Sequence, residues 1–299
     1  MSSLKSITVA FCLGILFLPG NLRAETAPTS VPELAAESAV TVPRSPEAVF
    51  LPSGDLFKPL LADPKEPRFY ISYLMVKFGS ENNKSVVGGY GEIFGLYRSG
   101  DGTAGYHWQA NFSGSIHAQF DLDSSTVDLV NTDYTFGFPF SIRKGAASYR
   151  IAVYHQSSHL GDEFLLKNNI ERVEFSYEAL ELIGSYELTS WRVYYGGEYL
   201  FHQGPTSLEP LALQMGVEYY DPAGSPGRSR LVGGLDVKSD QTHDWVLNSS
   251  AKAGLQFDST ESNGRYVRLL AVGYTGFVPY GQFYNNRISF AGVEVSLKF

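Results

Sequence analysis

Cysteine is almost absent from this sequence, positive charge is in the minority, and long apolar runs are missing after the first two dozen residues. The only cysteine, Cys12, lies in the first apolar stretch, so a chain without that stretch has no disulfide or thiol chemistry. The 31 acidic residues outnumber the 23 basic ones, which argues against nucleic-acid binding. Because no later apolar run is long enough for a membrane-spanning helix, closed strands are the remaining way to cross a bilayer.

The first 24 residues have the features of a secretory signal peptide. Lys5 provides a basic start, residues 7–18 are apolar, and the small residue Ala24 precedes Glu25. The apolar stretch is too short to span a membrane. We therefore expect cleavage after residue 24, which leaves 21 basic and 31 acidic residues and a net charge of −10.

Residues 25–67 read as a periplasmic leader. The part up to about residue 50 is rich in Pro, Ala, Ser and Thr and has few large apolar side chains, so we expect it to be flexible. The next stretch, 51–68, contains a short apolar cluster, Leu56, Phe57, Leu60 and Leu61. This cluster predicts a brief helix or plug that docks at the mouth of a barrel.

The remainder, 68–299, has the rhythm of a transmembrane β-barrel. Aromatic residues reach 14%, with 19 Tyr and 20 Phe, while charged residues reach only 18%, which suits strands with interfacial aromatic girdles. Strand-like segments alternate with turn signals. The sequence therefore predicts an all-β, antiparallel barrel of about twelve strands, at 68–78, 85–98, 105–120, 126–139, 147–158, 169–186, 191–202, 211–221, 229–239, 244–257, 265–275 and 288–299.

The last segment gives the clearest single signal. Its apolar residues recur at every second position and end on an aromatic residue: Ala291, Val293, Val295, Leu297 and Phe299. This pattern resembles the closing strand of outer-membrane barrels, whose terminal aromatic residue is read by the barrel-assembly machinery. The resemblance implies a bacterial outer-membrane protein surrounded by lipid, with Phe299 as the assembly signal.

One segment carries residues suited to chemistry, at the outward end of the fifth predicted strand. His155 and Ser157 are two residues apart, so they share a strand face with Ile151 and Val153, which we expect to face lipid. Their Cβ atoms are then about 7 Å apart, and an imidazole nitrogen can reach the hydroxyl. A serine hydrolase also needs a third group that orients the imidazole.

Asn169 and Glu171 are the expected third groups. On the returning strand we take Val173, Phe175, Tyr177 and Ala179 as the lipid face, and extending this parity backwards includes both residues. The alternate set, Arg172, Glu174, Ser176 and Glu178, is expected to face the lumen.

This His-x-Ser with an Asn twelve residues after the Ser resembles the site of outer-membrane phospholipase A, a twelve-stranded barrel, and of the lipid A deacylases, where the third member is a carboxylate. The resemblance implies His155 as general base, Ser157 as nucleophile and Asn169 as orienting residue, with Glu171 as substitute. It also implies a calcium ion that stabilises the oxyanion, for which Asp162 and Glu163 are the nearby oxygen donors. The chain departs from the motif at Ser158-His159, where the family usually places Asn after the Ser.

A second resemblance covers more of the chain but implies less. The 51–68 stretch, with its PSGDLFKPLLADPKEPR sequence, resembles the opening of a large family of uncharacterised bacterial outer-membrane proteins, and the resemblance continues into HQSSHLGDE. That family has no assigned activity.

Two classes of function remain open from the sequence. One is an outer-leaflet lipid acyl hydrolase that uses Ser157, His155 and Asn169. The other is a non-enzymatic barrel, a small pore or a structural or surface-interaction protein, in which the His and Ser residues form a polar interfacial girdle. A third interpretation of the segment, a metal cluster of His155, His159, Asp162 and Glu163, rests on mixed N/O ligands in nine residues.

Overall fold

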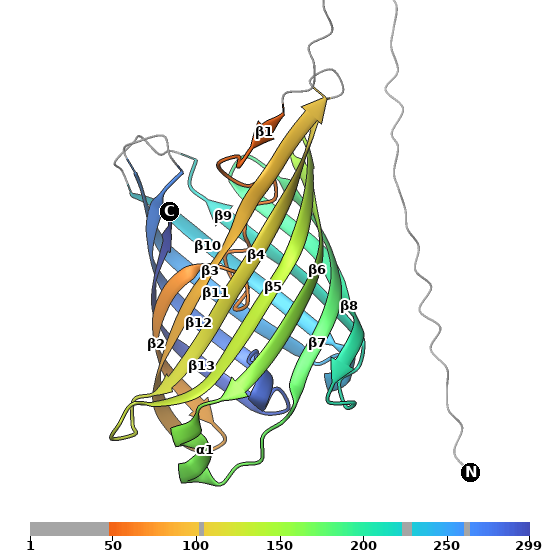
Figure 1. The fold of residues 1–299 in the computed structure, drawn as a ribbon. Helices are drawn as coiled ribbons and strands as arrows, with labels where there is room; N and C mark the ends of the chain where they lie inside the picture. The colour runs from red at the N-terminus through yellow and green to blue at the C-terminus, as the bar shows by residue number, and fades with distance from the viewer. Residues whose placement is uncertain (1–47, 102–104, 223–228, 260–263) are drawn as a thin grey trace, which may run out of the picture. The chain divides into compact units, whose positions relative to one another are not determined.

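The computed structural model describes residues 48–101, 105–222, 229–259 and 264–299. Twelve antiparallel strands, β2 to β13, pair in chain order, and the pairing of β13 with β2 closes the barrel (Figure 1). This confirms the predicted fold class and strand number. The strands are β2 Phe69–Phe78, β3 Glu81–Asp101, β4 Tyr106–Asp121, β5 Asp128–Lys144, β6 Ala147–Leu160, β7 Phe175–Glu187, β8 Trp191–Gly204, β9 Leu211–Tyr220, β10 Ser229–Asp240, β11 Leu247–Asp258, β12 Tyr266–Phe277 and β13 Arg287–Lys298.

Short elements decorate the barrel. The two-residue strand β1, Val49–Phe50, pairs with β3, and a helix, α1, covers Asp162–Asn168 between β6 and β7. Two 3-10 turns, η1 (Gln241–His243) and η2 (Gly281–Phe283), lie in the connections β10–β11 and β12–β13. Figure 1 shows α1 at the end of the barrel opposite the C-terminus. Among the described residues, no helix has the length and apolar character needed to cross a membrane.

Side chains alternate across the barrel wall. In β6, Tyr149, Ile151 and Val153 are exposed on the outer face, while Arg150 and Ala152 between them are buried. The same alternation recurs around the barrel and leaves many large apolar side chains exposed on its outside. An outer surface of this kind is stable where hydrocarbon replaces water, as in a lipid bilayer.

Charged pairs and residues 51–68, the segment that precedes β2, occupy part of the lumen. Phe57 and Leu60 of this segment pack against Ile183 and Tyr194 on the inner wall. The backbone N–H of Leu61 donates to a Glu218 carboxylate oxygen at 2.6 Å. The apolar cluster predicted at the barrel mouth thus lies inside the lumen, as bends and turns instead of a helix.

Ion pairs hold this lumenal segment to the strands. Arg150 lies between Glu66 of the segment and Glu181 of β7, with a nitrogen 2.7 Å from an oxygen of each. Near the other end of the segment, Lys58 contacts Glu187 at 2.7 Å. The predicted signal peptide, and the leader up to residue 47, lie outside the described residues.

Candidate functional site

The outer face of β6 presents His155 and Ser157, as the strand parity predicts. Both are partly exposed, whereas Gln156 and Ser158 beside them are 4% and 3% exposed and face inward. The His155 ring lies 5.2 Å from that of Phe136 on β5, measured between centroids. His155 and Ser157 therefore continue the apolar outer row of β6 towards the α1 end of the barrel.

A carboxylate on the neighbouring strand contacts His155. Glu178 of β7 lies directly opposite His155 in the strand register, and its Oε1 is 2.8 Å from His155 Nδ1. A carboxylate at Nδ1 favours the tautomer with the proton on Nδ1, which leaves Nε2 as a proton acceptor. This tautomer is the one that a general base needs.

A second histidine shares the same carboxylate. His202 of β8 lies opposite Glu178 on its other side, and its Nδ1 is 2.5 Å from Glu178 Oε2. The His202 side chain is 79% exposed, compared with 26% for His155 and 31% for Glu178. Glu178 is thus fixed between two imidazoles across three adjacent strands.

The predicted parity of the sixth strand was wrong. Leu180 and Leu182 are exposed on the outer face of β7, which places Glu178 on that face as well. Phe175 and Ala179 face inward, where they pack with Leu200 and Leu208 in an apolar cluster. Because this end of the lumen is itself apolar, apolar side chains do not mark the lipid face here.

The expected third members of the site, Asn169 and Glu171, do not lie on the strand that pairs with His155. The strand β7 begins at Phe175 instead of residue 169, because α1 and a six-residue link precede it. Asn169 is the C-cap of α1 in the left-handed region, with φ 48°, and Glu171 lies in the link. Among the described residues, the hydrogen bond that joins His155 to a side-chain carboxylate or amide is the one to Glu178.

The acidic residues suggested for calcium lie on α1. Asp162 and Glu163 are both exposed in its first turn, and Asp162 Oδ1 is 2.7 Å from an Arg172 nitrogen. In the described part of the chain, no group of three or more His, Cys, Asp or Glu side chains is placed to hold a metal ion. That finding contradicts the four-residue cluster of His155, His159, Asp162 and Glu163, and Arg172 already neutralises Asp162.

Comparison with known proteins places the chain in a family. Residues 22–299 match the family model described as "Protein of unknown function (DUF1207)". The chain belongs to this family. No curated protein matches it.

Solved structures show the same fold. Outer membrane phospholipase A from Escherichia coli superimposes with a TM-score of 0.55 and 16% identity, over 79% of this chain and 93% of that chain. The phospholipase of Salmonella typhi, described as a dimer with bound calcium, gives a TM-score of 0.56 and 17% identity over 81% and 95%. The protein is therefore an outer-membrane-type β-barrel with the fold of outer membrane phospholipase A.

Proposed function

We propose that this protein is an outer-membrane enzyme that hydrolyses acyl esters of lipids, with Ser157 as nucleophile, His155 as general base and Glu178 as the residue that positions the imidazole. The observation that carries the proposal is the 2.8 Å contact between Glu178 Oε1 and His155 Nδ1, on the outer face next to a serine. Glu178 therefore replaces both residues that the sequence suggested for this role, Asn169 and its substitute Glu171. A carboxylate as third member agrees with the resemblance to the lipid A deacylases.

The chemistry follows from these positions. His155 Nε2 accepts the Ser157 hydroxyl proton while Oγ attacks the ester carbonyl carbon, and the imidazolium that forms is stabilised by the Glu178 carboxylate. The proton then passes to the leaving alkoxide, which departs as the alcohol. Water hydrolyses the acyl-enzyme with His155 again as base. No hydrogen bond joins His155 and Ser157 among the described residues, and such bonds often tighten only when substrate binds.

The position of the site favours a membrane lipid as substrate. Ile151, Val153, Leu180 and Leu182 continue the outer rows of β6 and β7 away from the site, and these rows suit contact with acyl chains. With the C-terminus in the periplasm, the α1 end faces outward, so the site meets the outer leaflet. Phe299 then follows the closing strand β13 at the periplasmic end, where the assembly machinery would read it.

The test is acyl release by the refolded barrel. Native protein, His155→Ala and Ser157→Ala are incubated with phospholipid vesicles and with lipopolysaccharide, each with and without calcium. We expect release by the native protein and a loss of at least about a thousandfold in both variants, with heat-modifiable mobility unchanged. If acyl release required calcium, Asp162 and Glu163 would again be candidates for its ligands.

Two results would overturn the proposal. The first is full activity in Ser157→Ala. The second is no release by native protein on either lipid, with or without calcium, which would leave the segment as an interfacial girdle.

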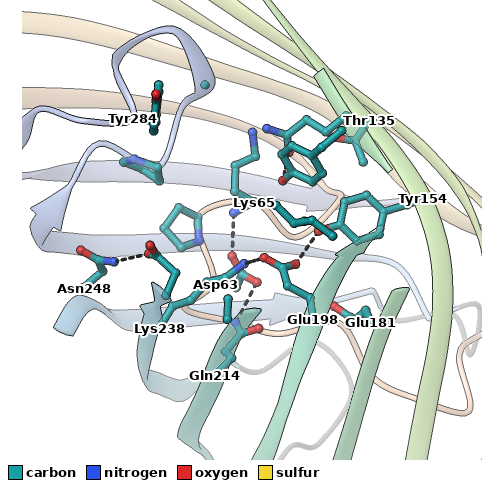
Figure 2. Close-up of a pocket in the computed structure, with 18 of the residues that line it drawn as sticks. Asp63, Lys65, Thr135, Tyr154, Glu181, Glu198, Gln214, Lys238, Asn248 and Tyr284 are labelled. Atoms are coloured by element: carbon teal, nitrogen blue, oxygen red, sulfur yellow. Dashed lines mark hydrogen bonds and ion pairs between the residues drawn. The ribbon is translucent and has the colours of Figure 1, made fainter. Parts of the chain in front are cut away.

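A non-enzymatic pore is the alternative, and a cavity of about 230 Å³ in the lumen (Figure 2) is the observation that favours it. Arg172 and Glu174, which the sequence predicts to face the lumen, lie before β7, whereas Glu181, Glu198 and Asp236 line the cavity. A pore predicts conductance in planar bilayers that changes in Glu198→Gln. Conductance that is unaffected by this variant, or absent, would count against it.

A further inference from the structure

The segment 51–68 occupies space that the barrel wall itself leaves open. A barrel of about eight strands is just wide enough for its own side chains to fill the interior, and this barrel has twelve strands. Part of the additional space holds the segment, and part is the cavity of about 230 Å³, which residues 63–67 border. Figure 2 shows Asp63 and Lys65 of the segment among side chains of the inner wall.

Phe57 is the main apolar anchor of this segment. Two guanidinium groups of the inner wall lie near its ring, with the Cζ atoms of Arg150 and Arg192 at 4.9 and 4.6 Å from the ring centroid. Phe57 is 2% exposed and Leu60 is 1% exposed. Burial and cation–π attraction therefore both hold the segment in the lumen, and both depend on few side chains.

The wall charges that the segment contacts also have partners within the wall. The segment reaches four of these charges, those of Arg150, Arg192, Glu218 and Glu294. Each of the four forms an ion pair with a neighbouring strand, and the pairs are Arg150–Glu181 at 2.7 Å, Arg192–Glu218 at 3.0 Å and Lys252–Glu294 at 2.7 Å. Departure of the segment would leave all three pairs in place, so it would not create the uncompensated charge that makes a broken buried pair costly.

Asp133 of β5 differs, because its ion pair is with Lys65 of the segment. It also accepts hydrogen bonds from three neutral donors of the barrel. These are the Asn131 amide at 2.9 Å, the Ser158 hydroxyl at 2.5 Å and the Gly281 backbone N–H at 3.2 Å. Asp133 would therefore remain hydrogen-bonded without Lys65, and water entering the lumen would solvate it further.

We propose that residues 51–68 are a removable plug, that the native barrel is closed to ions, and that its lumen conducts ions when the plug leaves. A polar lumen that water enters passes ions, as in porins. The proposal differs from the open pore considered above, because the native barrel does not conduct. It does not depend on the hydrolase site, which lies on the outer face of the wall.

Ala62 of the plug and Gly234 of β10 allow the plug to be locked in place. Ala62 is 0% exposed, and a Cβ at Gly234 would lie 3.4 Å from the Ala62 Cβ. Disulfides join Cβ atoms that are about 3.5–4.5 Å apart, so Ala62→Cys with Gly234→Cys should form one after a small adjustment. The native Cys12 is replaced by serine so that it does not compete.

The test uses the refolded full chain with this cysteine pair and with Phe57→Ser and Leu60→Ser, which weaken the plug. Loss of two buried side chains of this size should shift the equilibrium by at least about a thousandfold towards the undocked plug. We expect no conductance in planar bilayers while the disulfide is oxidised, and stepwise conductance after reduction. Reduction should also make the Ala62→Cys thiol reactive towards a water-soluble maleimide.

Lys58→Ser replaces the two weakening substitutions in the matched control, because the Lys58 side chain is 51% exposed and such a pair contributes little. After reduction this control should remain closed, with its thiol at position 62 unreactive. Heat-modifiable mobility verifies the fold of each variant. Steady conductance by the native or the oxidised barrel would overturn the proposal. So would an unreactive thiol in the reduced, weakened variant, or a reactive thiol without conductance, which would mean that the wall itself closes the lumen.

Discussion

Ser157 and Ser158 are neighbours in the chain, yet they belong to opposite sides of the barrel wall. The Ser158 hydroxyl is 2.5 Å from Asp133 and 2.9 Å from Asn131 inside the lumen, and its residue is 3% exposed. Ser157 is partly exposed on the outer face beside His155. The inner face has many polar groups that satisfy one another, whereas the outer face has a few among apolar side chains. We therefore assign stability to the inner polar groups and chemistry to the outer ones.

Apart from substitutions of Ser157 and His155, Glu178→Ala should reduce activity more than any other change on the outer face. Without the carboxylate, nothing holds the His155 tautomer, so acyl release should fall on the order of 10²–10⁴-fold. Glu178→Gln retains an acceptor oxygen for Nδ1–H and should recover part of this loss. Initial rates on vesicles measure both. Equal rates in the two variants would remove the positioning role from Glu178.

On the inner face, Arg150→Met should give the largest loss of stability. The change leaves the buried Glu66 and the partly buried Glu181 without their cation, which costs about 3–5 kcal/mol. Arg172→Met is the control, because its pair with Asp162 is exposed and contributes about 0–1 kcal/mol. Urea unfolding in detergent compares them. Acyl release per folded barrel should stay unchanged in both, and a selective loss of activity in Arg150→Met would break the separation of the two faces.

Ser158→Ala should affect stability and not activity. It removes the hydroxyl donor from two buried acceptors, Asp133 and Asn131, and should lower the free energy of unfolding by about 1–3 kcal/mol. Ser157→Ala is the matched variant, one residue away, and should leave the urea midpoint nearly unchanged. If the two variants exchanged their effects, the assignment of the faces would be wrong.

The smallest expected effect is that of His202→Ala. His202 contacts Glu178 from a largely exposed position, where such a pair contributes about 0.2–1 kcal/mol. Acyl release should therefore fall by no more than about fivefold. A loss comparable with that of His155→Ala in the vesicle assay would mean that His202 is as necessary for the reaction as His155, and would contradict this minor role.

The sequence predicts the barrel well because period-two alternation and turn spacing report directly on strands that separate lipid from a lumen. It also predicts the outward side of His155 and Ser157, since Ile151 and Val153 mark that face of β6. It does not predict Glu178 as their partner. The pairing of Glu178 with His155 depends on where β7 begins, and α1 and its link determine that start. It also depends on an apolar part of the lumen around Phe175 and Ala179, which reverses the expected parity of β7. A signal was present, because Leu180 and Leu182 share the parity of Glu178.

For residues 51–68, too, the sequence predicts the general position but not the contact partners. The apolar cluster from Leu56 to Leu61 predicts that residues 51–68 dock on the barrel, because such side chains need a partner surface. The charged partners of the segment come from strands far away in sequence, as in the pair of Glu66 and Arg150. Such pairs form only when the barrel closes, so the local sequence pattern does not predict them.

The most direct measurement of the central claim is labelling of the refolded native barrel with an alkyl fluorophosphonate, followed by peptide mass spectrometry. We expect one modified serine, Ser157, with labelling lost in His155→Ala and retained in Ser158→Ala. An unlabelled barrel, or a label on a serine other than Ser157, would contradict the assignment of hydrolytic chemistry to the outer face of β6 and β7.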